Sequence, residues 1–571
     1  MKDGFLKVAA ATPSIRVADC LYNARQIVAL MQEAETQGVK ILALPELCLT
    51  GKTCGDLFFQ RTLLDGAMDA LRTILQATKD CEVLTALGMP LRADGKLVNA
   101  AVLVQRGRVV AVSAKTVADR WFAAPEQESV VQLSGICEES PEEWPLMRTD
   151  TCVEISRMEG LRIGVVLGED LCATDPLSRK LAEQGATVIL NLSADAELVG
   201  RAEDRRQQAA AQSGRLCCSY LLANAGEGES TTDMVFGGHN LVAEYGRILA
   251  ESRFATGITA AVVDVQKLTQ ERRRLPHFPC HTAPATARCT WTVTETDLTG
   301  AVNPMPFLPQ GETAFEDILT LAALGLKQRL AHTNAKTAVL GLSGGLDSTL
   351  ALLIVRRAMA LLGRPMTDIV VVTMPCFGTT GRTRNNAVRL AERVGATLRT
   401  IPIGETVASH FKDIGHSMED HSVTFENAQA RERTQVLMDV ANQCGGLVIG
   451  TGDLSELALG WATYNGDHMS MYGVNGSIPK TLVRRLVSYA AQREQDGELS
   501  RVLEDILDTP VSPELLPPAD GEISQCTENL VGPYELHDFF LYEILRWGFS
   551  PCKIFRMAES AWGSGMTMPQ F

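Results

Sequence analysis

The sequence predicts an α/β protein with two domains. In its first half, short strands rich in Val, Ile and Leu alternate with longer helical patterns. A proline-rich stretch without periodicity follows, and a second series of strands and helices begins after it with a glycine-rich loop. We therefore divide the chain into residues 1–275, a linker at 276–312, and residues 313–571.

The first domain is expected to be a sandwich of sheets and helices. Its candidate strands are 5–12, 41–45, 98–104, 163–167, 188–192 and 259–264. Strands and helices that alternate in this way pack as layers around a common core. The apolar run at 5–12 is short and is soon followed by charged residues, so we expect a strand there and not a signal peptide.

The second domain is expected to be a doubly wound parallel sheet. A helix over 315–331 precedes the strand that enters the glycine-rich loop, and further strands are predicted at 369–373 and 447–451. In such sheets, ligands bind beyond the carboxyl ends of the strands.

Composition limits the functional classes. The chain has 571 residues, of which 46% are hydrophobic and 21% charged, as in ordinary globular proteins. It lacks the roughly 18 uninterrupted apolar residues of a membrane span. Its net charge of −15 argues against a nucleic-acid partner. The 15 cysteines show no zinc-like spacing, so we expect a reduced, cytoplasmic protein without a disulfide framework.

The glycine-rich loop is a candidate phosphate site. It comprises Ser343, Gly344, Gly345, Leu346, Asp347, Ser348 and Thr349. The two glycines allow successive N–H groups to face an anion at the N-terminus of the next helix, and the hydroxyl groups add donors. A plain glycine turn would not bring hydroxyls and a carboxylate together in this way. The loop lacks the Gly-x4-Gly-Lys-Ser/Thr spacing of kinases and GTPases.

A second strand end adds acidic side chains. Thr451 ends the strand at 447–451, and Asp453 and Glu456 follow at the start of a helix. Either carboxylate alone is as often a helix cap as a ligand. Together with Asp347, however, Glu456 predicts a Mg²⁺ site, because Mg²⁺ takes one or two carboxylates plus substrate phosphates.

Ser-Gly-Gly-x-Asp-Ser resembles the pyrophosphate loop of the N-type ATP pyrophosphatases, which cleave ATP between its α- and β-phosphates. The segments 427–433 and 450–467 resemble the substrate motifs of NAD synthetases. The segments 373–380, 508–518 and 530–540 are similar to the C-terminal half of bacterial glutamine-dependent NAD synthetases.

This resemblance implies a set of ligand contacts. ATP would be held by the phosphate loop, Thr451 and Lys480. Deamido-NAD would be held by Asn427, Arg431, Glu456 and Asp467. Mg²⁺ would bind Asp347 and Glu456. The implied enzyme is a ligase that forms an acyl-adenylate from deamido-NAD and ATP, which ammonia then converts to NAD without a protein nucleophile.

The same family carries an N-terminal nitrilase-fold (α-β-β-α) glutaminase that uses Glu, Lys and Cys. Glu46 matches the general base and Lys115 the lysine that stabilises the oxyanion. Gly168 stands where the family has its nucleophilic cysteine, and Cys172, four residues later, is a weak substitute. Without a thiolate no acyl-enzyme forms from glutamine.

Other departures affect the same function. The loop after Lys115 is about ten residues shorter than in the family, and Asp195 and Arg201 replace a serine and a lysine that contact glutamine. We therefore expect free ammonia, or ammonia from another protein, to be the nitrogen source. The family also continues past Ala558 with a segment that closes over the dinucleotide. Three consequences stay open here: weaker deamido-NAD binding, a closing segment supplied by a neighbouring subunit, or a truncated gene product.

Two alternatives stay open. One is another amidotransferase of the ATP pyrophosphatase type with a different carboxylate or carbonyl substrate. The other is a non-catalytic scaffold subunit that binds nucleotide without turnover. Relatives of this kind assemble through both domains, so a homo-oligomer is expected.

Overall fold

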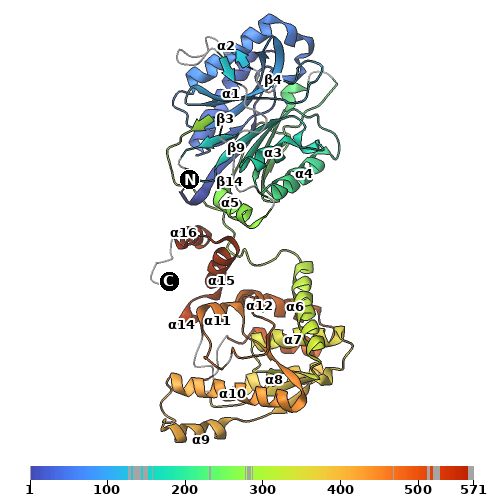
Figure 1. Ribbon diagram of the computed structural model, residues 1–571, viewed down its shortest axis with the longest axis vertical. Coiled ribbons are helices and arrows are strands. Elements are labelled where there is room, and N and C mark those ends of the chain that lie inside the picture. Colours follow the sequence, from blue (N-terminus) through green and yellow to red (C-terminus); the bar gives the residue numbers. More distant parts are fainter. Residues whose placement is uncertain are drawn as a thin grey trace. The chain divides into compact units, whose positions relative to one another are not determined.

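The computed structural model describes residues 2–125, 130–132, 143–145, 152–156, 158–230, 233–276, 278, 285, 287–466, 468–510, 515–517 and 527–563. It divides into two compact units, Met1–Ala301 and Val302–Phe571, drawn in Figure 1. The candidate ligand Asp467 lies outside the described residues, as does the C-terminal segment 564–571. No helix within these ranges is long and apolar enough to cross a membrane.

The first unit contains two mixed sheets. One has the order β14 (Gly257–Asp264), β1 (Phe5–Thr12), β2 (Ile41–Ala43), β3 (Leu84–Ala93), β4 (Lys96–Gln105) and β5 (Arg108–Ala114), while β6 (Val130–Gln132) pairs with β3 and β7 (Glu143–Pro145) pairs with β6. The other has the order β13 (Arg247–Ser252), β12 (Asn240–Glu244), β11 (Ser219–Asn224), β10 (Val188–Ser193), β9 (Arg162–Leu167), β8 (Val153–Ile155) and β15 (Ala287–Cys289).

Alternating side chains of these strands fill different cores. In the first sheet, Leu42 packs in the core shared with α1 (Cys20–Thr36) and α2 (Arg61–Ala77), whereas Ile41 and Ala43 pack between the two sheets. In the second sheet, Val166 faces the core that contains α3 (Leu177–Glu183). The strands are therefore apolar on both faces, and the predicted α-β-β-α sandwich is confirmed.

The second unit contains a parallel sheet. Its strands are β16 (Thr337–Gly341), β17 (Ile369–Thr373), β18 (Thr397–Thr400), β19 (Gly446–Gly450) and β20 (Tyr472–Gly473), in the order β18-β17-β16-β19-β20. The order reverses direction between β16 and β19. A crevice forms at such a switch point, because the connections on its two sides leave in opposite directions.

Helices cover both faces of this sheet. The helices of this unit are α6 (Glu312–Thr333), α7 (Leu346–Leu361), α8 (Gly381–Val394), α9 (Gly404–Ile414), α10 (Val423–Cys444), α11 (Leu454–Leu459), α12 (Lys480–Arg493), α13 (Gly497–Leu507), α14 (Glu528–Val531), α15 (Tyr534–Tyr542) and α16 (Pro551–Trp562). Leu340 packs with α6, α7, α8, α12 and α13, whereas its neighbour Val339 packs with α9 and α10. The doubly wound fold predicted from the sequence is confirmed.

Candidate active site

The glycine-rich loop connects β16 to α7 at the switch point. Gly344 has a φ of +85°, and a Cβ atom there would lie 2.2 Å from the carbonyl oxygen of Thr383, so only glycine fits. The Ser343 hydroxyl accepts from the N–H of Gly345 at 3.2 Å and lies 3.1 Å from that of Ser348. The loop is thus held open at the N-terminus of α7, where an anion is favoured.

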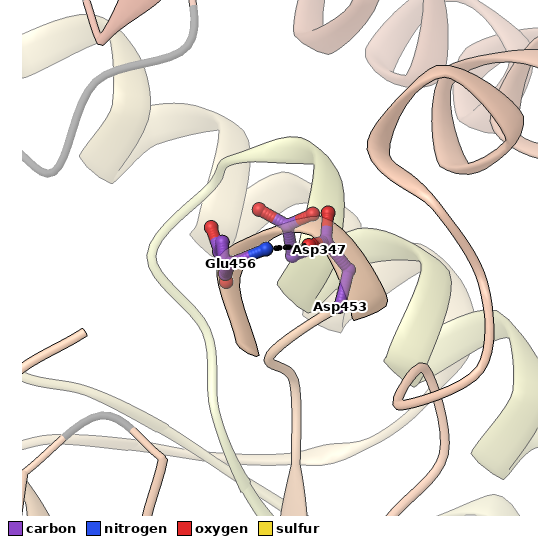
Figure 2. Close-up of side chains that lie close together, drawn as sticks. All are labelled: Asp347, Asp453 and Glu456. Carbon is purple, nitrogen blue, oxygen red and sulfur yellow. Dashed lines mark hydrogen bonds between the residues drawn. The ribbon is translucent and has the colours of Figure 1, made fainter. Parts of the chain in front are cut away.

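A buried lysine joins three carboxylates beside this loop. The Nζ atom of Lys480, the first residue of α12, lies 2.8 Å from Oδ2 of Asp347 and 2.8 Å from Oε1 of Glu456. It lies 3.0 Å from Oδ2 of Asp453. Figure 2 shows the three carboxyl groups converging, and their oxygens lie within 4.8 Å of one another. One ammonium cannot neutralise three carboxylates.

The titration of these groups reflects their burial. Burial raises the pKa of Asp453 to about 6, although Lys480 opposes the shift. Burial and the nearby charge of Asp347 raise the pKa of Glu456 to about 8. Burial acts to lower the pKa of Lys480, but the three carboxylates outweigh it and hold that pKa well above its usual value. The lysine therefore stays charged, and Asp453 and Glu456 resist ionisation unless a further cation is near.

Asn475 connects the two strand-end loops. Its Nδ2 atom donates to the carbonyl oxygens of Asp347 and Thr451, both at 2.9 Å, and the side chain is fully buried. It fixes the start of α7 against the end of β19. Nothing in the local sequence around Asn475 indicates this role.

A cleft of about 490 Å³ opens at this point. Among the candidate residues, it is lined by Ser343, Gly345, Leu346, Asp347, Ser348, Asn427, Thr451 and Glu456. Thr349 is buried, and its hydroxyl donates to the carbonyl of Gly345 at 2.8 Å, inside the first turn of α7. Arg433, Trp461 and His468 also line the cleft. They lie in or beside the two segments 427–433 and 450–467, but no role for them follows from the sequence alone.

The two candidates on α10 differ in position. Asn427 lines the cleft and accepts from the hydroxyl of Thr463 at 2.8 Å. Arg431, one turn further along α10, is exposed, and its Nε donates to the carbonyl of Tyr464 at 3.2 Å. Arg431 therefore holds the 461–466 segment against α10, and its charge remains at the surface.

The first unit has a second cluster at the ends of its strands. Glu46 follows β2, is fully buried, and lies 3.1 Å from Nζ of Lys115, which follows β5. Asn99 on β4 donates to the same carboxylate oxygen. Nζ of Lys52 lies 3.4 Å from the other oxygen. Sequence reasoning did not identify Lys52 or Asn99, because their contacts with Glu46 depend on the tertiary fold.

Gly168 lies beside this pair. It follows β9, has a φ of +72°, and donates its N–H to the carbonyl of Leu192 at 2.8 Å. A Cβ atom at this position would lie 2.9 Å from Nζ of Lys115 and 3.6 Å from Oε2 of Glu46. A side chain at position 168 would thus contact both groups, but glycine supplies none.

Cys172 lies at the end of a short 3₁₀ turn, Asp170–Cys172, and is exposed. Its Sγ is 3.7 Å from Oε1 of Gln208 and 3.6 Å from the guanidinium of Arg201, both on α4 (Arg201–Arg215). Arg201 also donates to Asp195 at 3.1 Å. The thiol therefore contacts α4, and Asp195 and Arg201 form an ion pair.

The segment after Lys115 folds back as a tight turn. The Asp119 carboxylate accepts from the N–H groups of Trp121 and Phe122, both at 2.9 Å. The Phe122 ring packs edge-on against Phe58, with centroids 4.8 Å apart. Aromatic packing and the Asx turn fix this segment close to the body of the unit.

Comparisons with known proteins cover nearly the whole chain. Residues 318–549 match the NAD synthase family and residues 7–273 match the carbon-nitrogen hydrolase family. Glutamine-dependent NAD(+) synthetases of Mycobacterium tuberculosis and Mycobacterium leprae are 36% and 37% identical, over 98% of this chain and 86% of each relative. A structure of glutamine-dependent NAD+ synthetase from Acinetobacter baumannii in complex with ADP is 21% identical, over 98% of this chain and 91% of that chain, with a TM-score of 0.38.

Proposed function

The chain belongs to the family of glutamine-dependent NAD(+) synthetases, which are ligases, and from this we propose that it converts deamido-NAD to NAD with ATP and free ammonia. The observation that carries the proposal is the position of the phosphate loop, Lys480 and three carboxylates at the switch point of a doubly wound sheet. Such crevices bind nucleotides, and the cleft here is lined by both strand-end loops.

We assign the phosphates of ATP to the loop 343–349. The N–H groups at the start of α7 and the hydroxyls of Ser343 and Ser348 provide donors, and the helix N-terminus favours negative charge. The hydroxyl of Thr349 supports the loop from within α7.

Mg²⁺ fits the residues present. Oδ1 of Asp347 is buried and has no hydrogen-bond partner among the described residues. Carboxylate oxygens are the ligands that Mg²⁺ prefers. A divalent ion would bring the charge of three carboxylates and one ammonium to zero. We propose Asp347 and Glu456 as its ligands, with Asp453 buried beside them, and when bound the ion would neutralise charge on the ATP phosphates.

The chemistry then needs positioning and charge stabilisation. A carboxylate oxygen of deamido-NAD attacks the α-phosphorus of ATP, and the bond from that phosphorus to the bridging oxygen breaks, releasing pyrophosphate. Lys480 places a positive charge where negative charge grows on the phosphoryl oxygens. Ammonia next attacks the acyl carbon, AMP departs with the carbon–oxygen bond electrons, and the nitrogen loses a proton.

We propose that the nitrogen comes from ammonia because position 168 has no nucleophile. Hydrolysis of glutamine through an acyl-enzyme needs a thiol or hydroxyl next to a base. Glu46 and Lys115 are in contact, but the residue beside them at the end of β9 is Gly168, which has no side chain.

Asn427 and Arg431 stay our candidates for contacts to deamido-NAD, together with Asp467.

A substrate panel tests the synthetase. The proposal expects AMP, pyrophosphate and NAD in equal amounts when deamido-NAD, ATP, Mg²⁺ and ammonium are supplied. Turnover with a different carboxylate and none with deamido-NAD would favour another amidotransferase. ATP binding without pyrophosphate release from any substrate would favour a scaffold subunit.

A further inference from the structure

A buried carboxylate on α15 connects the helices that carry the candidate catalytic residues. Asp538 is 1% exposed, and its Oδ1 accepts from the hydroxyl of Ser455 on α11 at 2.5 Å. Its Oδ2 accepts from the backbone N–H of Thr481 on α12 at 2.8 Å. One side chain thus binds the first turns of two helices.

These two contacts surround Lys480 and Glu456. Ser455 is the residue before Glu456, and its hydroxyl oxygen also accepts from the backbone N–H of Lys480 at 2.9 Å. Thr481 is the residue after Lys480. The carboxylate of Asp538 therefore fixes the backbone on both sides of the lysine and next to the glutamate, whose side chains meet at 2.8 Å.

The first turn of α12 needs an acceptor from elsewhere. Its capping position is Pro479, which provides no side-chain hydrogen bond. The free N–H groups at a helix start are otherwise satisfied by water or by a nearby acceptor. Asp538 supplies that acceptor, and the helix N-terminus favours its negative charge.

A second residue of α15 lies against the same lysine. The ring centroid of Tyr534 is 5.5 Å from Nζ of Lys480, within range of a cation–π contact. The Tyr534 ring is buried, and its hydroxyl has no hydrogen-bond partner in the described part of the chain. Both α15 residues therefore restrict where the lysine side chain lies.

We propose that Asp538 is a positioning residue for the adenylation step. Through Ser455 and Thr481 it sets the separation of Lys480 and Glu456. The ammonium of Lys480 then meets the ATP phosphates while the three carboxylates around it keep their relative positions. This inference rests on the proposed synthetase function. Asp538 itself touches none of the reacting groups.

The test compares two variants with a matched control. Asp538→Asn keeps one acceptor but turns an N–H₂ donor toward the Ser455 hydroxyl, and Ser455→Ala removes that hydroxyl. The control is Asp496→Asn, because Asp496 caps α13 in the same unit by accepting from the N–H of Glu498 at 2.9 Å. Rapid mixing with deamido-NAD, ATP and Mg²⁺ measures the rate of pyrophosphate formation, and steady-state assays measure KM for ammonium.

We expect Asp538→Asn to slow pyrophosphate formation at least about tenfold, with KM for ammonium within about twofold of the native value. Its melting temperature should fall no further than that of Asp496→Asn. The double variant Asp538→Asn/Ser455→Ala should be no slower than the slower single variant, because both changes break one connection.

The inference is overturned if Asp538→Asn forms pyrophosphate as fast as Asp496→Asn, or if the two single effects multiply in the double variant. In either case, pyrophosphate formation by the native protein would leave the proposed function intact. If the native protein forms no pyrophosphate from deamido-NAD, the proposed function fails and this inference fails with it.

Discussion

The ammonium of Lys115 lies 2.9 Å from the point where a Cβ atom would stand at Gly168. The lysine tip therefore fills part of the space that a side chain at position 168 would use. Its Nζ also lies 3.1 Å from Glu46 and 4.0 Å from Asp119. A new side chain there has to displace the flexible end of one lysine and adopt a φ of +72°.

Gly168→Cys alone is therefore expected to give little glutaminase activity. The thiol would stand beside Glu46, but the turn after Lys115 and the pair Asp195–Arg201 remain unchanged. NAD formation with glutamine should stay below about a tenth of the rate with ammonium, and Gly168→Ala serves as the control with a Cβ atom and no thiol. A Gly168→Cys protein that uses both sources equally would show that the missing thiol is the sole defect.

Gly344→Ala should abolish ATP-dependent turnover. The added Cβ atom would lie 2.2 Å from the backbone of Thr383 at a φ of +85°, so the phosphate loop has to move. Gly363→Ala is the control, because Gly363 has a φ of +67° but open space around it. We expect the control to lose only about 1 kcal/mol of stability and keep its activity, as measured by urea unfolding and pyrophosphate release. Equal losses of activity in Gly344→Ala and Gly363→Ala would contradict the argument that Gly344 is required because it lies against Thr383 of α8.

Lys480→Met should both inactivate the synthetase and destabilise its unit. Removing the ammonium leaves the buried carboxylate of Asp453 and the half-buried carboxylates of Asp347 and Glu456 without their cation, and breaking a buried ion pair typically costs about 3–5 kcal/mol. Mg²⁺ should raise the melting temperature of Lys480→Met more than that of the native protein, since it can replace part of the lost charge. Lys412→Met, at an exposed position of α9, is the control. If Mg²⁺ raised the melting temperatures of Lys480→Met and of the native protein by the same amount, a cation site at these carboxylates would be contradicted.

Glu82 should make the stability of the first unit sensitive to acid. Burial acts to raise the pKa of its carboxyl group, but hydrogen bonds from Thr292 and Arg106 outweigh it and lower the pKa to about 2. A lowered pKa stabilises the folded state fully above the ordinary value near 4.5, and this stabilisation disappears as the pH falls toward 2.

Glu82→Gln should remove that dependence. We expect it to lose about 1 kcal/mol at pH 7, allowing for solvent screening, and much less at pH 3, as measured by urea unfolding. Glu159→Gln is the control, because that side chain is 91% exposed in its pair with Arg273. A loss of the same size at both pH values would show that Glu82 acts through packing and not through its charge.

The sequence predicted those features that depend on neighbouring residues. The strands at 163–167, 188–192 and 369–373 are mostly apolar runs, as expected for strands buried on both faces, and they correspond to β9, β10 and β17. The loop 343–349 is predicted as a phosphate site because its glycines, hydroxyls and carboxylate are contiguous, and that role stays a prediction. The strand predicted at 447–451 is shifted by one residue from β19.

Other features depend on contacts between distant segments. Asn475 and Asp538 act through hydrogen bonds to segments that are distant in the sequence. Asp538 lies in the segment 530–540 that resembles the family, but the residues around it do not indicate that it binds α11 and α12. Lys52 approaches Glu46 from a turn whose backbone N–H donates to buried Glu229 at 2.8 Å. Thr349 was grouped with the anion donors from its place in the motif, whereas helix geometry directs its hydroxyl to Gly345.

The most direct measurement is NAD formation from deamido-NAD, ATP and Mg²⁺ with either ammonium or glutamine as the only nitrogen source. We expect product with ammonium and less than about one hundredth of that rate with glutamine, because position 168 lacks a nucleophile. Equal rates from both sources would contradict it, and loss of the glutamine rate in Cys172→Ala would then identify Cys172 as the nucleophile.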